Sequence, residues 1–362
     1  MSNNLALNIE DIKKEKDGLD VLADIYIHAV LGERLSEKNL LRLQWFGIYA
    51  EDEFQETFQI KIPLNMGELN LDQLKILTFI SKEFANNSLT FSSEQKVEFK
   101  DIKLHNIPEI LKLLNDISLS TLFESGHTVR RVATCPLNGI DADQLIDVSD
   151  IVKQLDNLFI GNKKYSNLPS KLQFAVSGYE EGCALNYIPD VAFNASKDNK
   201  GKVIFKINIF SNEIGYIFPS QVLNTAKTIA NIYRDFGSRK SLENSFTHFV
   251  LEMGIPKFID ILESSLSFSI KAILFNDIKK SKKPRMGIND SKIENQSYIG
   301  CRIENLKIDS SNLDTLTSLL EKHSASRIKI THKGNLIILD APTTNVNDFA
   351  KDLQKISFNP FA

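Results

Sequence analysis

The chain is built around a run that opens with SGHTVRRVATCPLNGID (residues 125–141) and closes with LPSKLQFAVSGYEEG (residues 168–182). Arg130 and Arg131 are adjacent, so in an extended segment their side chains point to opposite faces and only one can reach a given pocket. Lys171 follows a Leu-Pro step that ends any preceding helix, and it leads into an apolar strand. Two cations from separate elements indicate an anion-binding pocket. Ordinary solvated surface charges are the alternative interpretation.

These two phrases resemble the nitrite and sulfite reductase family, whose members carry sirohaem coupled to a 4Fe-4S cluster. A third phrase, RLQWFGIYAEDEFQETFQIKIPLNMGELNLDQLKILTFISKEF (residues 42–84), is similar to the family's first ferredoxin-like half-repeat. The resemblance covers roughly Leu41 to the C-terminus. It implies an α+β fold in which two ferredoxin-like half-repeats flank a middle α/β domain of the sirohaem-reductase type.

An internal duplication is visible from the apolar register alone. A constant step of 239 residues repeats the order strand, helix, hairpin, helix of Phe58 to Ile117 near the C-terminus, without a gap. The step keeps the strand period and the helix period in phase, so each copy should bury the same faces. Two unrelated α+β segments with a common element order are the alternative. The matched pairs are Leu77 with Leu316, Ile80 with Leu319, Leu89 with Ile328, Phe91 with Ile330, Asp101 with Asp340, Leu114 with Leu353 and Ile117 with Ile356.

The chain divides at changes of composition and of element order. The basic stretch DIKKSKKPRMGIND, which begins at Asp277, indicates a solvated linker or, alternatively, a docking patch for an acidic partner such as a small electron carrier. The predicted parts are a polar lead-in (1–18), a first half-repeat with an N-terminal helix (19–120), a middle domain (121–276), a basic linker (277–294) and a second half-repeat (295–362).

Composition excludes several classes of protein. Hydrophobic residues make up 42% and charged residues 25% of the 362 residues, which is typical of a soluble globular chain. The net charge of −3 gives no field for binding nucleic acid or an anionic membrane. No apolar run approaches the roughly 20 residues that span a bilayer. The N-terminus lacks the apolar core of a secretory signal, so we expect a cytoplasmic protein.

The resemblance implies a set of basic residues that holds sirohaem and a small oxyanion, because both are rich in negative oxygens. Arg130 matches the arginine of the family's TVRRV phrase, and Lys171 matches the first lysine of its LPSK phrase. We therefore expect both residues to be catalytic and to bind the cofactor. They should lie in one cleft between the middle domain and the half-repeats.

Two positions depart from the family's pattern. Glu94 stands where the family usually has an arginine, and Gln173 stands where it usually has a second lysine. A carboxylate at this place repels an anionic ligand that an arginine would attract. Arg131 could compensate in part, although its neighbour faces the other way. Gln95 and Arg131 complete the predicted cofactor-binding residues.

A 4Fe-4S cluster needs four converging thiolates. The chain has three cysteines, Cys135, Cys183 and Cys301, in separate segments and without CxxC spacing. The histidines show no zinc-binding spacing either, so no metal ligands are predicted. The sequence therefore predicts a C-terminally truncated member of the family that lacks the cluster-binding domain.

Three functions follow from the resemblance. The first is a partial or split sirohaem-dependent oxidoreductase component that acts on sulfite or nitrite. A partner chain would then supply the cluster and a small carrier the electrons, and the isolated chain would be inactive. The second is a non-catalytic binding or scaffold module that retains the fold. The third is a relative of the precorrin monooxygenase of the cobalamin pathway, which resembles the same fold.

Overall fold

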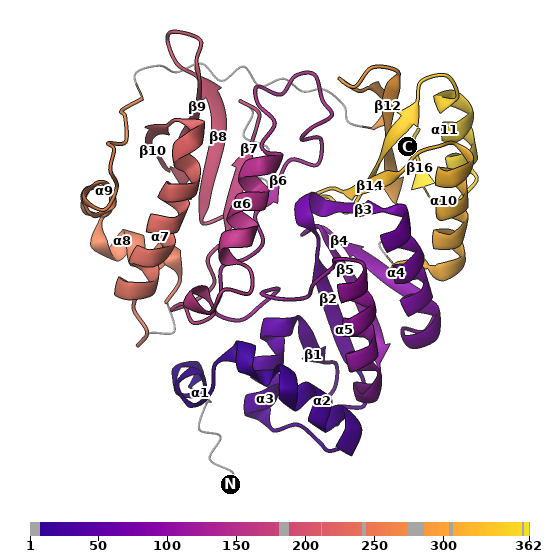
Figure 1. Cartoon of the computed structure of the whole chain (residues 1–362), viewed down its shortest axis with the longest axis horizontal. Helices are drawn as coiled ribbons and strands as arrows, with labels where there is room; N and C mark the ends of the chain where they lie inside the picture. Colours follow the sequence, from indigo (N-terminus) through magenta and orange to yellow (C-terminus); the bar gives the residue numbers. More distant parts are fainter. Residues whose placement is uncertain are drawn as a thin grey trace.

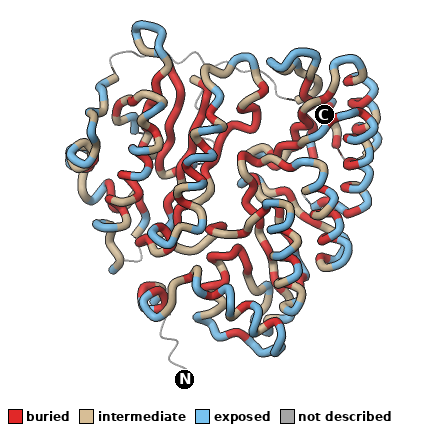
Figure 2. The backbone as a smooth tube through the Cα atoms, viewed as in Figure 1, coloured by how far each residue is buried: buried red, intermediate tan, exposed pale blue. Residues whose placement is uncertain are grey.

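The structure is a computed structural model that describes residues 8–180, 188–210, 212–240, 244–273, 286–303, 307–356 and 358–361. It contains two main hydrophobic cores. One core is shared by the first and the last parts of the chain, and the other belongs to the middle part. Buried residues follow the strands of both parts (Figure 2). No helix among the described residues combines the length and the apolar character needed to cross a membrane.

Both half-repeats have the predicted order of elements. The first part of the chain contains α1 (Ile9–Glu15), α2 (Leu22–Leu31), α3 (Glu37–Leu43), β1 (Ile48–Ala50), β2 (Phe58–Pro63), β3 (Glu68–Asn70), α4 (Leu71–Phe84), β4 (Ser88–Ser92), β5 (Lys96–Ile102) and α5 (Ile107–Asp116). The last part contains β11 (Gly287–Asp290), β12 (Gln296–Ile303), β13 (Lys307–Asp309), α10 (Ser310–Lys322), β14 (Arg327–Ile330), β15 (Leu336–Pro342), α11 (Val346–Gln354) and β16 (Phe358–Asn359).

The strand register confirms the duplication. Val97 of β5 pairs with Phe91 of β4, and Leu336 of β15 pairs with Ile330 of β14, so the step of 239 residues holds for both partners. Each of these residues is fully buried. The duplicated apolar pattern therefore produces two hairpins with the same face turned inward.

The two half-repeats exchange short strands. Strand β3 of the first half-repeat pairs with β14 of the second, and β13 of the second pairs with β4 of the first. The resulting sheets have the orders β1-β2-β5-β4-β13 and β11-β12-β15-β14-β3. Helices α4 and α10 pack against each other beside these sheets (Figure 1). The exchange explains why both halves share one hydrophobic core.

Local sequence sets the limits of helix α4. The side chain of Asn70 accepts a hydrogen bond from the backbone of Gln73, whose own side chain accepts one from the backbone of Asn70. This capping box satisfies backbone N–H groups that have no partner in the first turn. Leu74, Leu77 and Ile80 form the buried stripe. Helix α4 is thus the first helix in the predicted order strand, helix, hairpin, helix.

The middle part forms a sheet with the order β10-β9-β8-β7-β6. Strands β6, β7 and β8 run parallel, whereas β9 and β10 are antiparallel to their neighbours. Helices α6 and α7 lie over one face (Figure 1). The elements are β6 (Ala133–Thr134), α6 (Ser149–Phe159), β7 (Phe174–Ser177), β8 (Val191–Lys197), β9 (Val203–Ile209), β10 (Asn212–Ile217), α7 (Val222–Phe236), α8 (Phe246–Met253) and α9 (Ile255–Ser264).

The prediction of a polar lead-in at the N-terminus was wrong for residues 9–15, which form helix α1. Lys13 is buried, and its ammonium donates to the carbonyl of Leu168 at 2.7 Å. Glu10 is also buried, pairs with Lys13 and accepts from Arg239 at 3.1 Å. Because these charges pair with one another, a helix that buries Ile12 and two charged side chains packs against the middle part.

The structure describes part of the predicted basic linker. Residues 277–285 lie outside the described part of the chain. Residues 287–290, which we also assigned to the linker, form β11 and pair with β12. None of the residues of this strand is fully buried, so backbone hydrogen bonds hold the strand in place. Its sequence has no apolar pattern from which the strand could be predicted.

Candidate anion-binding site

A cavity of about 390 Å³ and a second one of about 290 Å³ lie side by side where the middle part meets the half-repeats. We call the smaller one the anion cavity. Both predicted catalytic residues, Arg130 and Lys171, line it. Its lining residues are Tyr49, Lys61, Pro63, Leu64, Glu94, Gln95, Lys96, Phe123, Glu124, Ser125, Arg130, Arg131, Val132, Ala133, Lys171 and Gln173.

Backbone pairing brings Arg130 and Lys171 together. Val129 and Leu172 form a parallel bridge, and the backbone N–H of Arg130 donates to the carbonyl of Leu172 at 2.8 Å. The two quoted stretches of sequence therefore lie side by side, with Arg130 on one and Lys171 on the other. This contact depends on chain pairing, so residue types alone could only suggest it.

The guanidinium of Arg130 is held in place. It donates to the hydroxyl of Thr128 at 2.6 Å and to the carbonyl of Gly126 at 2.9 Å. Burial lowers the pKa of Arg130, while Glu124 and Tyr49 oppose this decrease. An arginine stays charged in either case. Arg130 is thus a fixed cation at the wall of the anion cavity.

Lys96 is the centre of an ion-pair network in which two carboxylates balance its positive charge. Its ammonium contacts Glu124 at 2.6 Å and also pairs with Glu94. The hydroxyl of Tyr49 donates to the second oxygen of Glu124. Burial lowers the pKa of Lys96, but the two carboxylates raise it by more. Lys96 therefore stays protonated, and its charge is already balanced by carboxylates before any ligand binds.

Lys61 and Lys171 differ from Lys96 in this respect. The ammonium of Lys61 lies 4.9 Å from the ring centroid of Tyr49. Lys171 is exposed. Within the part of the chain that the structure describes, neither ammonium makes a hydrogen bond or an ion pair with a side chain. These two lysines are consequently the cations that an anionic ligand can recruit without breaking an internal pair.

Gln173 stands where a second lysine was expected and does two things. Its side chain lines the anion cavity, and its backbone N–H donates to the carboxylate of Asp190 at 2.8 Å. Burial raises the pKa of Asp190 to about 6, although the Gln173 bond, Lys171 and Arg130 oppose the rise. Asp190 was missed in the sequence because a single aspartate before an apolar strand carries no distinctive pattern.

Gln95 and Arg131 both line the anion cavity, and both have structural partners. The amide of Gln95 donates to the carbonyl of Ile330 at 2.9 Å, across the two half-repeats. Arg131 pairs with Asp156 at 3.3 Å. Arg131 and Pro63 line both cavities. Binding of a cofactor by either side chain stays a prediction.

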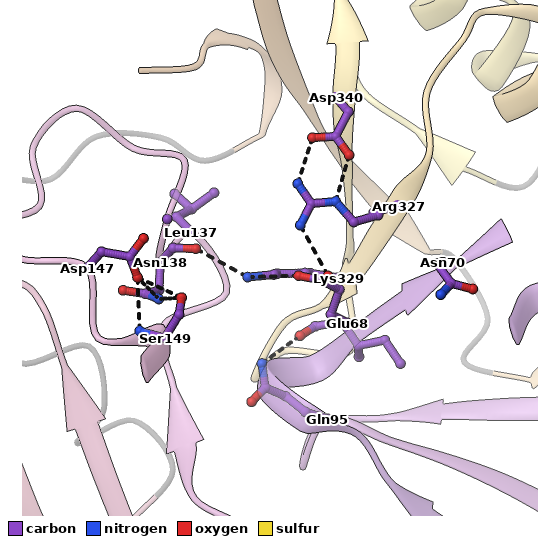
Figure 3. Close-up of polar contacts among 12 residues, drawn as sticks. Glu68, Asn70, Gln95, Leu137, Asn138, Asp147, Ser149, Arg327, Lys329 and Asp340 are labelled. Atoms are coloured by element: carbon purple, nitrogen blue, oxygen red, sulfur yellow. Dashed lines mark hydrogen bonds and ion pairs between the residues drawn. The ribbon is translucent and has the colours of Figure 1, made fainter. Parts of the chain in front are cut away.

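The larger cavity is lined by paired charges (Figure 3). Arg327 donates twice to Asp340, at 2.7 Å each, and once to Glu68 at 3.1 Å. Lys329 is buried, lies 3.5 Å from Glu68 and donates to the carbonyl of Asn138 at 3.2 Å. These bonds join both half-repeats and the middle part. We call this network the polar joint.

The described residues do not fit a 4Fe-4S cluster. Cys135 and Cys301 are buried, and Cys183 lies outside the described residues. Burial raises the pKa of the Cys301 thiol, which disfavours the thiolate that a cluster requires. No group of three or more histidine, cysteine or acidic residues suited to a metal ion occurs in the described ranges.

Two sequence families match this chain. The family described as "Nitrite and sulphite reductase 4Fe-4S domain" matches residues 125–270. The family described as "Nitrite/Sulfite reductase ferredoxin-like half domain" matches residues 52–117 and 292–356, which are the two copies of the duplication. A domain of the 4Fe-4S type is therefore present, where the sequence had suggested its absence.

Individual proteins agree with these matches. The chain is 25% identical to a ferredoxin–nitrite reductase of Leptolyngbya laminosa, over 97% of this chain and 73% of the relative. It is also 25% identical to a ferredoxin-type sulfite reductase of Mycobacterium tuberculosis, over 96% of this chain and 68% of the relative. The solved structure of Mycobacterium tuberculosis NirA has the same fold, with a TM-score of 0.89 and 22% identity over 98% of this chain and 70% of that one.

Proposed function

Because this chain belongs to the nitrite and sulfite reductase family, we propose that it binds a small oxyanion, nitrite or sulfite, for reduction. The observation that supports this proposal is the anion cavity, which Lys61 of the first half-repeat lines together with Arg130 and Lys171 of the middle part. A compact anion would give Lys61 and Lys171 the direct ion pair that neither of them makes among the described residues. Among the alternatives, a non-catalytic scaffold has no support from relatives that match over nearly the whole chain.

The three cations have different roles in this proposal. Arg130 is fixed by Thr128 and Gly126, so it orients the anion through a planar pair of N–H donors. Lys61 and Lys171 are mobile donors that balance the negative charge, and an ammonium can pass a proton to a reduced oxygen. Together they hold the ligand where charge develops during reduction.

The family binds sirohaem, and the anion cavity fits the anionic parts of that cofactor in sign. Lys61, Lys171 and Arg130 would hold its carboxylates or the substrate beside it. When bound, sirohaem supplies the redox centre for electron transfer to the substrate. The relatives are named as ferredoxin-dependent enzymes, so a small electron carrier is the proposed partner.

We infer that the cluster's thiolates come from residues outside these 362, because three separate cysteines cannot supply four ligands. The chain, prepared anaerobically from cells that make sirohaem, should therefore contain no acid-labile sulfide. Sulfide and iron in cluster proportion would contradict this inference. Adding a partner segment that carries cysteine pairs should supply both iron and sulfide. A sirohaem absorbance band in the chain alone, without sulfide, would separate cofactor binding from cluster binding.

The proposed anion site is tested by calorimetric titration with nitrite and with sulfite. Replacing Lys171 by methionine removes one available charge and should weaken binding on the order of tenfold. Lys112→Met is the matched control, because Lys112 is exposed on helix α5 and lines no described cavity. Equal affinity of Lys171→Met and the unaltered protein would contradict the proposal.

A further inference from the structure

Glu94 lies at the mouth of the anion cavity, at the tip of the hairpin between β4 and β5. Its side chain is 71% exposed, whereas that of the other lining carboxylate, Glu124, is 3% exposed. Glu124 is fully engaged by Lys96 and Tyr49. Glu94 is consequently the carboxylate that an approaching anion meets.

Glu94 is also fixed as a negative charge. Burial opposes ionisation, but the hydrogen bond from Lys96 and the charges of Lys171 and Lys61 hold the pKa of Glu94 below its usual value. Its backbone N–H donates to the hydroxyl of Ser92 at 3.3 Å, which ties down the hairpin tip. The two lysines available to a ligand thus already lie in the field of a carboxylate.

We propose that Glu94 sets the specificity of the anion cavity by favouring a singly charged oxyanion, nitrite, over the sulfite dianion. The proposal rests on the anion site described above and names its substrate. Coulomb energy is proportional to the product of the charges, so Glu94 repels a dianion twice as strongly as a monoanion. Lys61, Lys171 and Arg130 attract both anions, and they attract the sulfite dianion more strongly. Glu94 reduces this difference in electrostatic attraction between sulfite and nitrite.

Removal of the Glu94 charge leaves no other charge unpaired. Lys96 keeps its contact with buried Glu124 at 2.6 Å. The exposed hairpin tip loses only one surface ion pair, and such pairs contribute little to stability. The variant Glu94→Gln therefore tests charge without disturbing the fold, and an unchanged melting temperature verifies this.

The experiment compares nitrite and sulfite affinities by calorimetry, above neutral pH and at low ionic strength. In Glu94→Gln, sulfite should bind on the order of tenfold more tightly and nitrite on the order of threefold more tightly. Glu94→Arg should increase both effects. Added salt should reduce them, because exposed charges are screened.

The matched control is Glu83→Gln, which changes the net charge equally on an exposed turn of α4. It should leave both affinities and their ratio unchanged. If the unaltered protein binds an anion and Glu94→Gln leaves the sulfite-to-nitrite ratio unchanged, the role of Glu94 is overturned while the anion site stands. If no protein in the series binds either anion, the anion site itself is overturned and the role of Glu94 with it.

Discussion

The anion cavity and the polar joint lie next to each other and are both rich in cations, yet they use them differently. In the polar joint, Arg327 and Lys329 are bonded to carboxylates and carbonyls on neighbouring elements. In the anion cavity, Lys61 and Lys171 have no such bonds among the described residues. We infer that the pairing of cations, and not their number, distinguishes a structural contact from the proposed ligand site.

The largest expected effect comes from breaking the polar joint. Arg327→Ala removes three hydrogen bonds, takes away the ion-pair partner of Asp340 and leaves Glu68 with Lys329 alone. We expect a loss of about 3 kcal/mol in the free energy of unfolding, because the partly buried carboxylate of Asp340 is left without an ion pair. Chemical denaturation measures it.

The matched comparison for this variant is Lys171→Met in the anion cavity. Lys171 is exposed and bonded to no described side chain, so its removal should change the free energy of unfolding by less than about 0.5 kcal/mol. Similar losses in Arg327→Ala and Lys171→Met would erase the distinction between the two cavities.

A smaller effect concerns Asp190, which lies beside the anion cavity. Its pKa is raised to about 6 in the folded protein from an ordinary value of 3.8. The folded state thus holds this proton while the unfolded state has already lost it. Stability is therefore highest below the ordinary pKa and decreases as pH rises from about 4 to about 6.

Asp190→Asn should remove this pH dependence. Above pH 6 the variant should be more stable than the unaltered protein by about 2 kcal/mol, and the difference should vanish near pH 4. Denaturation curves at a series of pH values measure it. The asparagine oxygen can still accept from the backbone of Gln173, so the local bond is conserved. A difference independent of pH would show that ionisation of Asp190 is not its cause.

Much of the fold could be predicted because the apolar register is local. Helix α4 and the hairpin of β4 and β5 agree with the spacing of residues such as Leu77 and Val97, and the step of 239 residues recovers the second copy. Helix α1 could not be predicted in this way. Besides Ile12 it buries the charged residues Glu10 and Lys13, and partners distant in the sequence make their burial favourable.

The candidate site shows the same limit. Arg130 and Lys171 stand out in the sequence, and they do line one cavity. Lys61 was missed, since a lysine on an alternating strand reads as an ordinary solvent-facing charge. The amide of Gln95 donates to the carbonyl of Ile330 in the other half-repeat, a contact that the sequence did not indicate, and cofactor binding by Gln95 stays a prediction.

The duplication, the α+β class and the count of three cysteines follow from periodicity and composition, which are properties of the chain alone. The exchange of β3 and β13 between the half-repeats is visible only in the folded protein. The fold likewise determines which cations keep an available charge. Charge pairing depends on distances between segments far apart in sequence, and Coulomb energy depends on those distances and on burial.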